Sequence, residues 1–258
     1  MEGFTRIGVD GVAHNPGMVW WRRAACPVRP VEQEWIDRSM DWFVAEFGLE
    51  RLRGEVVLPT DGYFPGEYRG TREDVRVVLE RLCAHMGIDP ARVELEHDEA
   101  DDNPELSAHV PIHWSGSGAA GHHRMRDGRS VIGIRDDQAA RPAGLVATVA
   151  HELGHVLLLA EGRISAKRKD HEPLTDLLTV FFGLGIFSAN SSFDYSRDDQ
   201  YTRTSRLGYL TEPMFGYALA RYAWLRGEPD PDWARYLDTN PRTFLKRGLR
   251  FLTYESGS

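Results

Sequence analysis

Cysteine is scarce in this sequence. Cys26 and Cys83 are the two present in 258 residues, and they stand far apart without a CxxC pairing. A disulfide framework or a thiolate metal site needs more cysteines at closer spacing, so both thiols are interpreted as reduced, buried side chains in a reducing compartment. With 41% hydrophobic residues, a chain of this length buries a core without covalent cross-links.

Long apolar runs are also missing. No uncharged stretch approaches the roughly 18 residues that a membrane span requires. The longest run, 177–189, contains two glycines and suits a buried core helix. The N-terminal residues show no basic segment followed by an apolar one, as a secretory leader would. We therefore expect a cytoplasmic protein without a membrane partner.

Positive charge is in deficit. The sequence has 31 Lys and Arg against 39 Asp and Glu, which gives a formal net charge of −8. Binding to phosphate backbones depends on clustered Lys and Arg, so we expect no nucleic-acid partner. The composition leaves the oligomeric state open.

The chain has no internal repeat, and its periodicity changes along its length. Residues 1–90 form an expected N-terminal helical region, with one helix over 31–47 and a second beginning at an N-cap, Thr71. Residues 91–140 alternate like a small sheet, with strands at 92–97, 106–114 and 130–135 and a Gly-rich hairpin loop between the last two.

The remainder of the chain is expected to be helical, apart from a polar segment, 190–206, that lacks an apolar period. The apolar spacing predicts helices at 142–159, 173–187, 212–226, 231–237 and 241–252. The fold class that follows is α+β, a small and mostly antiparallel sheet packed on a helical body. Residues 1–90 and 91–258 are either two regions or one continuous domain, 1–258.

The pattern with the clearest chemistry is His151-Glu152-Leu153-Gly154-His155. On a helix, residues four apart project from one face, so the two imidazoles can hold one zinc ion. Glu152 lies beside them, placed to accept a proton from a water on the metal. A five-residue match can arise by chance. Here, however, the motif falls in a predicted helix with an apolar opposite face, directly after a predicted strand.

A catalytic zinc site has three protein ligands and one open position, so a third ligand is required. The segment 170–176, DHEPLTD, follows the first helix after a loop long enough for the chain to reverse. It offers Asp170, His171, Glu172 and Asp176. Pro173 disfavours helical geometry at the residue before it, so we place Glu172 at the N-cap and keep Asp176, one turn further, as an alternative.

HExxH followed by ExxxD on a second helix resembles the gluzincin metallopeptidases. The apolar continuation LLTVFFGLGIF is also similar to the small metallopeptidases associated with phage repressors. The resemblance covers about residues 130–188, roughly a quarter of the chain. It implies that zinc is held by His151, His155 and Glu172, with Glu152 as the general base. It also implies that Asp176 orients a ligand imidazole. Asp176 remains the alternative third ligand, with His171 and Asp170 behind it.

The same resemblance implies that strand 130–135 is a sheet edge along which an extended peptide lies. A tetrahedral intermediate also needs a donor for its oxyanion. Tyr209 and His123, or its neighbour His122, are the candidates for that role.

The expected function is a zinc-dependent hydrolase, in particular a metallopeptidase, acting on a peptide or small amide. Two alternatives stay open. One is a non-catalytic zinc-binding protein that regulates a partner; the retained Glu152 disfavours it, because structural zinc sites need no general base. The other is a zinc enzyme that acts on a small non-peptide substrate.

Overall fold

The computed structural model describes residues 25–64, 66–98, 125–198 and 210–256, and most of them are helical. In chain order the elements are α1 (Pro30–Phe47), α2 (Leu49–Leu52), α3 (Arg72–Met86), the 3₁₀ turn η1 (Pro90–Arg92), β1 (Val93–Asp98), β2 (Met125–Arg126), β3 (Arg129–Arg135), α5 (Asp136–Ala139), α6 (Pro142–His155), the π-helical turn η2 (Val156–Ala160), α7 (His171–Phe181), α8 (Gly185–Asp198), α9 (Glu212–Arg226), the 3₁₀ turn η3 (Asp232–Tyr236) and α10 (Thr239–Ser256).

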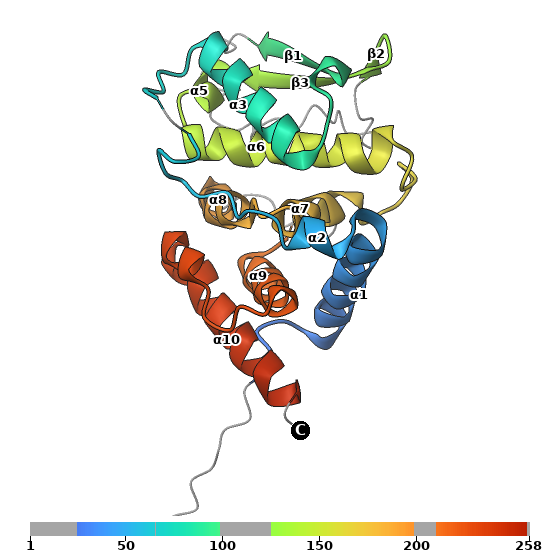
Figure 1. The fold of residues 1–258 in the computed structure, drawn as a ribbon, viewed down its shortest axis with the longest axis vertical. Helices are drawn as coiled ribbons and strands as arrows, with labels where there is room; N and C mark the ends of the chain where they lie inside the picture. Colours follow the sequence, from blue (N-terminus) through green and yellow to red (C-terminus); the bar gives the residue numbers. More distant parts are fainter. Residues whose placement is uncertain (1–24, 65, 99–124, 199–209, 257–258) are drawn as a thin grey trace, which may run out of the picture.

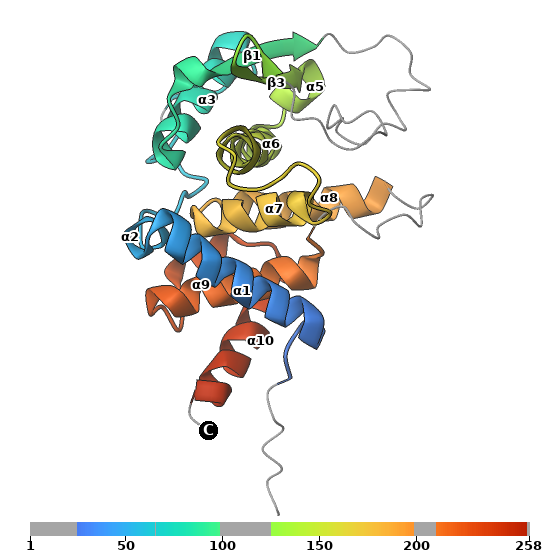
Figure 2. The same ribbon diagram turned by 90° about the vertical axis from the view of Figure 1, so that its right-hand side faces the viewer.

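Helix α6 is the central element of the layered structure. Figure 1 shows it between the sheet with α3 on one side and α7 with α8 on the other. Figure 2 shows the same helix end-on in that position, with α1, α9 and α10 beyond α7. Helix α6, which carries the HExxH residues, therefore lies between these two layers.

The described part of the sheet has three strands in the order β1-β3-β2. β1 runs parallel to β3 from Val93, opposite Ser130, to Asp98, opposite Arg135. β2 is antiparallel to β3 and pairs with only its first two residues. The expected mostly antiparallel sheet is thus wrong, because strand periodicity sets which face a side chain takes but not the direction of the neighbouring strand.

Two further expectations about the sheet differ from the structure. β3 is not an edge strand, since strands pair on both its sides, although β2 covers only its start. β2 lies in the segment expected as a loop, and the hairpin turn between β2 and β3 is Asp127-Gly128, both with positive φ. An Asp-Gly pair is the residue choice that such a two-residue turn favours. The strand expected at 106–114 lies outside the described residues.

Several helix boundaries confirm the sequence predictions. α1 and α9 begin and end within one residue of the expected limits. α3 follows Thr71, whose hydroxyl accepts from the Asp74 backbone N–H at 3.2 Å, while the Asp74 carboxylate accepts from the Thr71 N–H at 3.0 Å. This reciprocal capping satisfies two N–H groups that have no partner inside the helix.

Other boundaries differ from the predictions. The single helix expected at 173–187 is two helices, because Gly183 takes a left-handed φ of 79° between α7 and α8. α8 then continues to Asp198, into the segment expected to be irregular because it lacks an apolar period. The segment expected as a helix at 231–237 is a short 3₁₀ turn.

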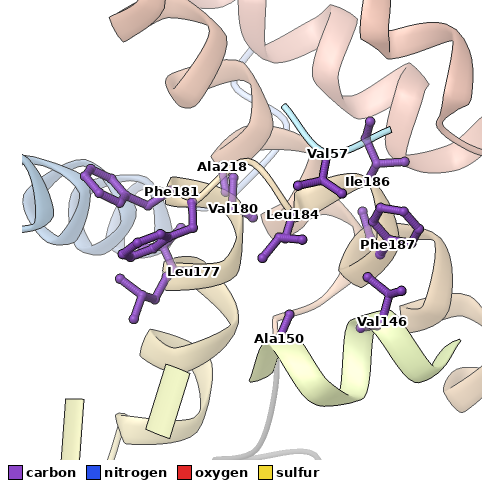
Figure 3. Close-up of a cluster of buried hydrophobic side chains, with 14 of the residues drawn as sticks. Val57, Val146, Ala150, Leu177, Val180, Phe181, Leu184, Ile186, Phe187 and Ala218 are labelled. Carbon is purple, nitrogen blue, oxygen red and sulfur yellow. The ribbon is translucent and has the colours of Figure 1, made fainter. Parts of the chain in front are cut away.

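Apolar side chains from four helices meet on the side of α6 that faces α7 and α8. Figure 3 shows Val146 and Ala150 of α6 facing the α8 side chains, with α7 residues and Val57 completing the cluster. All ten residues that the figure labels are buried in the core. This packing holds α6 against α8 and against α7, the helix that carries Glu172 and Asp176.

Among the described helices, one segment, Pro142–Ala160, is long and apolar enough by composition to cross a membrane, with a mean hydropathy of 1.5. Of that window, 72% is buried inside the protein, as the core helix of a layered fold would be. The charged Glu152 interrupts this segment, so the longest uncharged apolar run of the sequence is 177–189 instead.

The turn at Gly183 gives a first testable prediction. A Cβ at this position would lie 2.8 Å from the backbone oxygen of Glu55 and 3.3 Å from Cα of Val56. Gly183→Ala should therefore lower the free energy of unfolding by the roughly 1–2 kcal/mol of a left-handed residue plus about 1–3 kcal/mol for the overlap. Chemical denaturation measures the loss.

Gly162→Ala is the matched control for this substitution. Gly162 has a similar φ of 71° but nothing within 4 Å of its would-be Cβ, so only the backbone cost applies. Equal losses for the two variants would contradict the close approach of residues 55–56 to Gly183.

Candidate metal centre

His151 and His155 lie one turn apart near the C-terminal end of α6. Pro142 begins this helix, where a missing N–H leaves no hydrogen bond unmade, and apolar residues cover the faces that meet the core. Both imidazoles are nearly inaccessible, at 2% and 6% exposure. Two polar rings buried side by side require partners, and these come from α7.

Glu172 lies in the first turn of α7, as its second residue. The helix begins at His171, so the expectation that Pro173 opens it, with Glu172 at the N-cap, is wrong. N–H groups in the first turn have no carbonyl partner inside the helix. Pro173, the third residue of α7, therefore costs no helical hydrogen bond. The helical turn directs Glu172 towards α6.

Asp170 precedes α7 and is held away from the histidines. Its carboxylate accepts hydrogen bonds from the Trp35 indole at 2.8 Å and from the Arg168 guanidinium at 2.6 Å. These bonds lower the pKa of Asp170 to about 2, with burial opposing them. Asp170 therefore anchors α1 to the start of α7 and is not one of the converging groups.

The converging atoms are His151 Nε2, His155 Nε2 and Glu172 Oε2. The two nitrogens are 3.1 Å apart, and the carboxylate oxygen lies 3.1 Å from His151 and 3.4 Å from His155. Zinc bonds of 2.0–2.1 Å at tetrahedral angles separate neighbouring ligand atoms by about 3.3 Å. The three atoms thus have the spacing of one tetrahedral face, and these residues could hold a metal ion.

Asp176 meets the opposite side of the His151 ring. Its Oδ1 lies 2.7 Å from His151 Nδ1, and its Oδ2 accepts from the backbone N–H of Leu210 at 3.1 Å. The Nδ1–H donates to this carboxylate, which leaves the Nε2 lone pair directed at the cluster. Geometry therefore places Glu172, and not the alternative Asp176, with the two Nε2 atoms, and gives Asp176 the orienting position.

Electron-pair donors so close together need a positive charge between them. Burial lowers the pKa of His151, but hydrogen bonds to Asp176 and Glu172 outweigh burial and raise it to about 9. Burial raises the pKa of Glu172, yet the two histidines hold it well below its ordinary range. Without metal, a proton on His151 supplies this charge, and a metal ion would replace that proton.

Glu152 projects beside the cluster and is half-buried. Burial raises the pKa of its carboxyl group, the positive charge of His155 and His151 lowers it, and Glu172 raises it further, with a net upward shift. A carboxylate whose pKa moves towards neutrality is a better proton acceptor at neutral pH. His171 adds a third imidazole, its ring centre 6.1 Å from that of His155, outside the three-residue group.

The remaining sequence candidates have no described position. Tyr209, His122 and His123 lie outside the described residues. Two residues that the sequence did not indicate contact the site. The backbone N–H of Leu210 donates to Asp176, and the Thr175 hydroxyl lies 3.3 Å from His155 Nδ1. The signal for Thr175 was its place beside Asp176 on the second helix.

Comparison with family models gives no match, and comparisons with curated proteins and with solved structures likewise find no significant similarity. The resemblance to gluzincins therefore depends on the two sequence motifs alone.

The charge balance of the cluster predicts how stability depends on pH. In metal-free protein the pKa of His151 is raised above its ordinary value, so its contribution is complete below about pH 6.5 and is lost as the pH rises through about 9. The lowered pKa of Glu172 gives a contribution that is lost in acid. Thermal unfolding in the presence of a chelator should therefore show falling stability between pH 6.5 and 9.

Zinc should reverse this trend, because ligand atoms must lose their protons to bind it and affinity rises with pH. The stabilisation caused by one equivalent of zinc should grow from pH 6 to pH 8. A zinc-induced shift that is absent, or that shrinks over this range, would contradict the metal centre.

Proposed function

We propose that this protein is a zinc-dependent hydrolase that cleaves a peptide or small amide bond, with Glu152 as the general base. The observation that supports this most is the convergence of His151, His155 and Glu172 at tetrahedral spacing. Three protein ligands leave one coordination position for solvent, which distinguishes catalytic zinc sites from structural ones.

The donor set favours zinc over other common ions. Two imidazole nitrogens and one carboxylate oxygen match the ligands of catalytic zinc. Magnesium and calcium prefer sites made of oxygen atoms. The two cysteines lie on other segments, Cys26 before α1 and Cys83 in α3, so no thiolate belongs to this group.

Zinc bound here would lower the pKa of water towards neutrality and polarise a substrate carbonyl. Glu152 would accept the proton of the attacking water and donate it to the leaving nitrogen as the C–N bond breaks. Asp176 keeps the proton of the His151 ring on Nδ1, so Nε2 remains a lone-pair donor. Half-burial of Glu152 limits competing water around the carboxylate.

The decisive experiment is Glu152→Gln, which keeps size and polarity but removes the proton acceptor. Purified protein should retain about one zinc per chain, because Glu152 is not among the three converging groups, and lose roughly 10²–10⁴-fold in hydrolysis. Metal analysis and cleavage of a fluorescence-quenched peptide library measure the two effects. Activity equal to that of the wild type in Glu152→Gln would exclude the proposed mechanism.

Glu50→Gln is the matched control, since Glu50 is an exposed carboxylate on the short helix α2. It should keep both zinc and hydrolysis. A wild-type protein that binds zinc but cleaves no member of peptide and amide libraries would instead favour a metal-binding role without catalysis.

A separate prediction concerns metal retention. His151→Ala removes one of three ligands and leaves a half-buried carboxylate, Glu172, without its nearest partner. Zinc content after dialysis should fall from about one per chain to near zero, while His97→Ala, on strand β1, should retain it. Full zinc occupancy in His151→Ala would show that the ion binds elsewhere.

A further inference from the structure

The two helices that carry the converging residues approach each other closely at Gly154 and Thr175. Gly154 is the fourth residue of the HExxH segment, and a Cβ there would lie 2.7 Å from Cγ2 of Thr175. Thr175 is completely buried. Because Gly154 has no side chain, the Thr175 methyl group can pack against α6 between His151 and His155.

The hydroxyl group of Thr175 faces two polar groups. It donates its one hydrogen to the backbone carbonyl of His171 at 2.8 Å and lies 3.3 Å from Nδ1 of His155. Since that hydrogen is already engaged, the oxygen can only accept from the imidazole. The His155 proton is thereby placed on Nδ1, and the Nε2 lone pair is directed at the cluster.

Thr175 thus serves His155 as Asp176 serves His151. Consecutive residues of one turn of α7 reach the Nδ1 atoms of both imidazoles, one through a neutral hydroxyl and the other through a carboxylate. The ExxxD pattern accounts for Asp176 alone. A histidine ligand holds its metal best when its other nitrogen has a hydrogen-bond partner, because that partner fixes the tautomer and the ring orientation.

We infer that Thr175 is a positioning residue of the metal centre, in which the hydroxyl sets the tautomer of His155 and the methyl group sets the separation of α6 and α7 at Gly154. This inference rests on the metal site of the proposed function but not on its hydrolytic chemistry. Since the hydroxyl and the methyl group have different roles, substitutions that remove one and keep the other can test each role separately.

The test is the dissociation constant for zinc at pH 7, measured by competition with a chromophoric chelator. Thr175→Val retains the branched shape and removes the oxygen, so we expect zinc binding to weaken by about 10–100-fold. Thr175→Ser retains the oxygen and removes the methyl group, so its affinity should stay within about threefold of wild type while its melting temperature falls.

Thr179→Val is the control for loss of a buried hydroxyl from the same helix. Thr179 is also completely buried, but its hydroxyl donates to the backbone carbonyl of Asp176 and pairs with the Ser188 hydroxyl. It should lower stability and leave zinc affinity unchanged. A structural role of Thr175 alone would make Thr175→Val behave like Thr179→Val, and that result would overturn the inference.

Two further measurements keep the test decisive. If Thr175→Val does not fold, Thr175→Ala removes the oxygen without adding a methyl group, and unchanged zinc affinity in it would equally overturn the inference. In the zinc-loaded protein the Nδ1 proton of His155 should exchange with solvent more slowly in wild type and Thr175→Ser than in Thr175→Val, because the Thr175 oxygen accepts it. Loss of hydrolysis in Glu152→Gln is independent of these results, so the inference and the hydrolase proposal can fail separately.

Discussion

Three electron-pair donors that face one another in a protein interior repel unless a positive charge lies among them. His151, His155 and Glu172 are in this position, with neighbouring atoms 3.1–3.4 Å apart. The two imidazoles also need hydrogen-bond partners at their other ring nitrogens, which keep the Nε2 atoms directed at one point. Residues outside the HExxH segment supply these partners. Without metal, hydrogen bonds from His151 to Asp176 and Glu172 outweigh burial and raise the pKa of His151, so a proton on this ring compensates the converging donors.

Hydrogen bonds around α7 hold the converging side chains in place. Asp176 connects the His151 ring to the backbone of Leu210, and Thr175 connects the His155 ring to the carbonyl of His171. Trp35 on α1 binds Asp170 immediately before the helix, so α1 fixes the point at which α7 begins. Elements far apart in sequence therefore restrain the turn that carries Glu172.

Burial has opposite effects on the groups at this centre. It raises the pKa of Glu152 and acts to lower the pKa of His151, but the carboxylates of Asp176 and Glu172 reverse the effect at His151. Helix α6 therefore carries an imidazole and a neighbouring carboxylate whose pKa values are both raised, the first by its carboxylate partners and the second by burial. Shifted pKa values of neighbouring titratable groups are common at functional sites.

The sequence by itself determined which residues belong together on each helix. The four-residue spacing of the histidines, the acidic pair on the next helix and the capping residue Thr71 act within a turn or two of backbone, where geometry follows from local order. Local order could not give the parallel pairing of β1 with β3, the break at Gly183 or the choice of Glu172 over Asp176. Those depend on which distant segments meet. Packing between elements sets the direction of neighbouring strands, the close approach of two backbones and the residue that contacts the second nitrogen of an imidazole ring. Thr175 is the clearest case: its role exists only because Gly154, on another helix, leaves room for it.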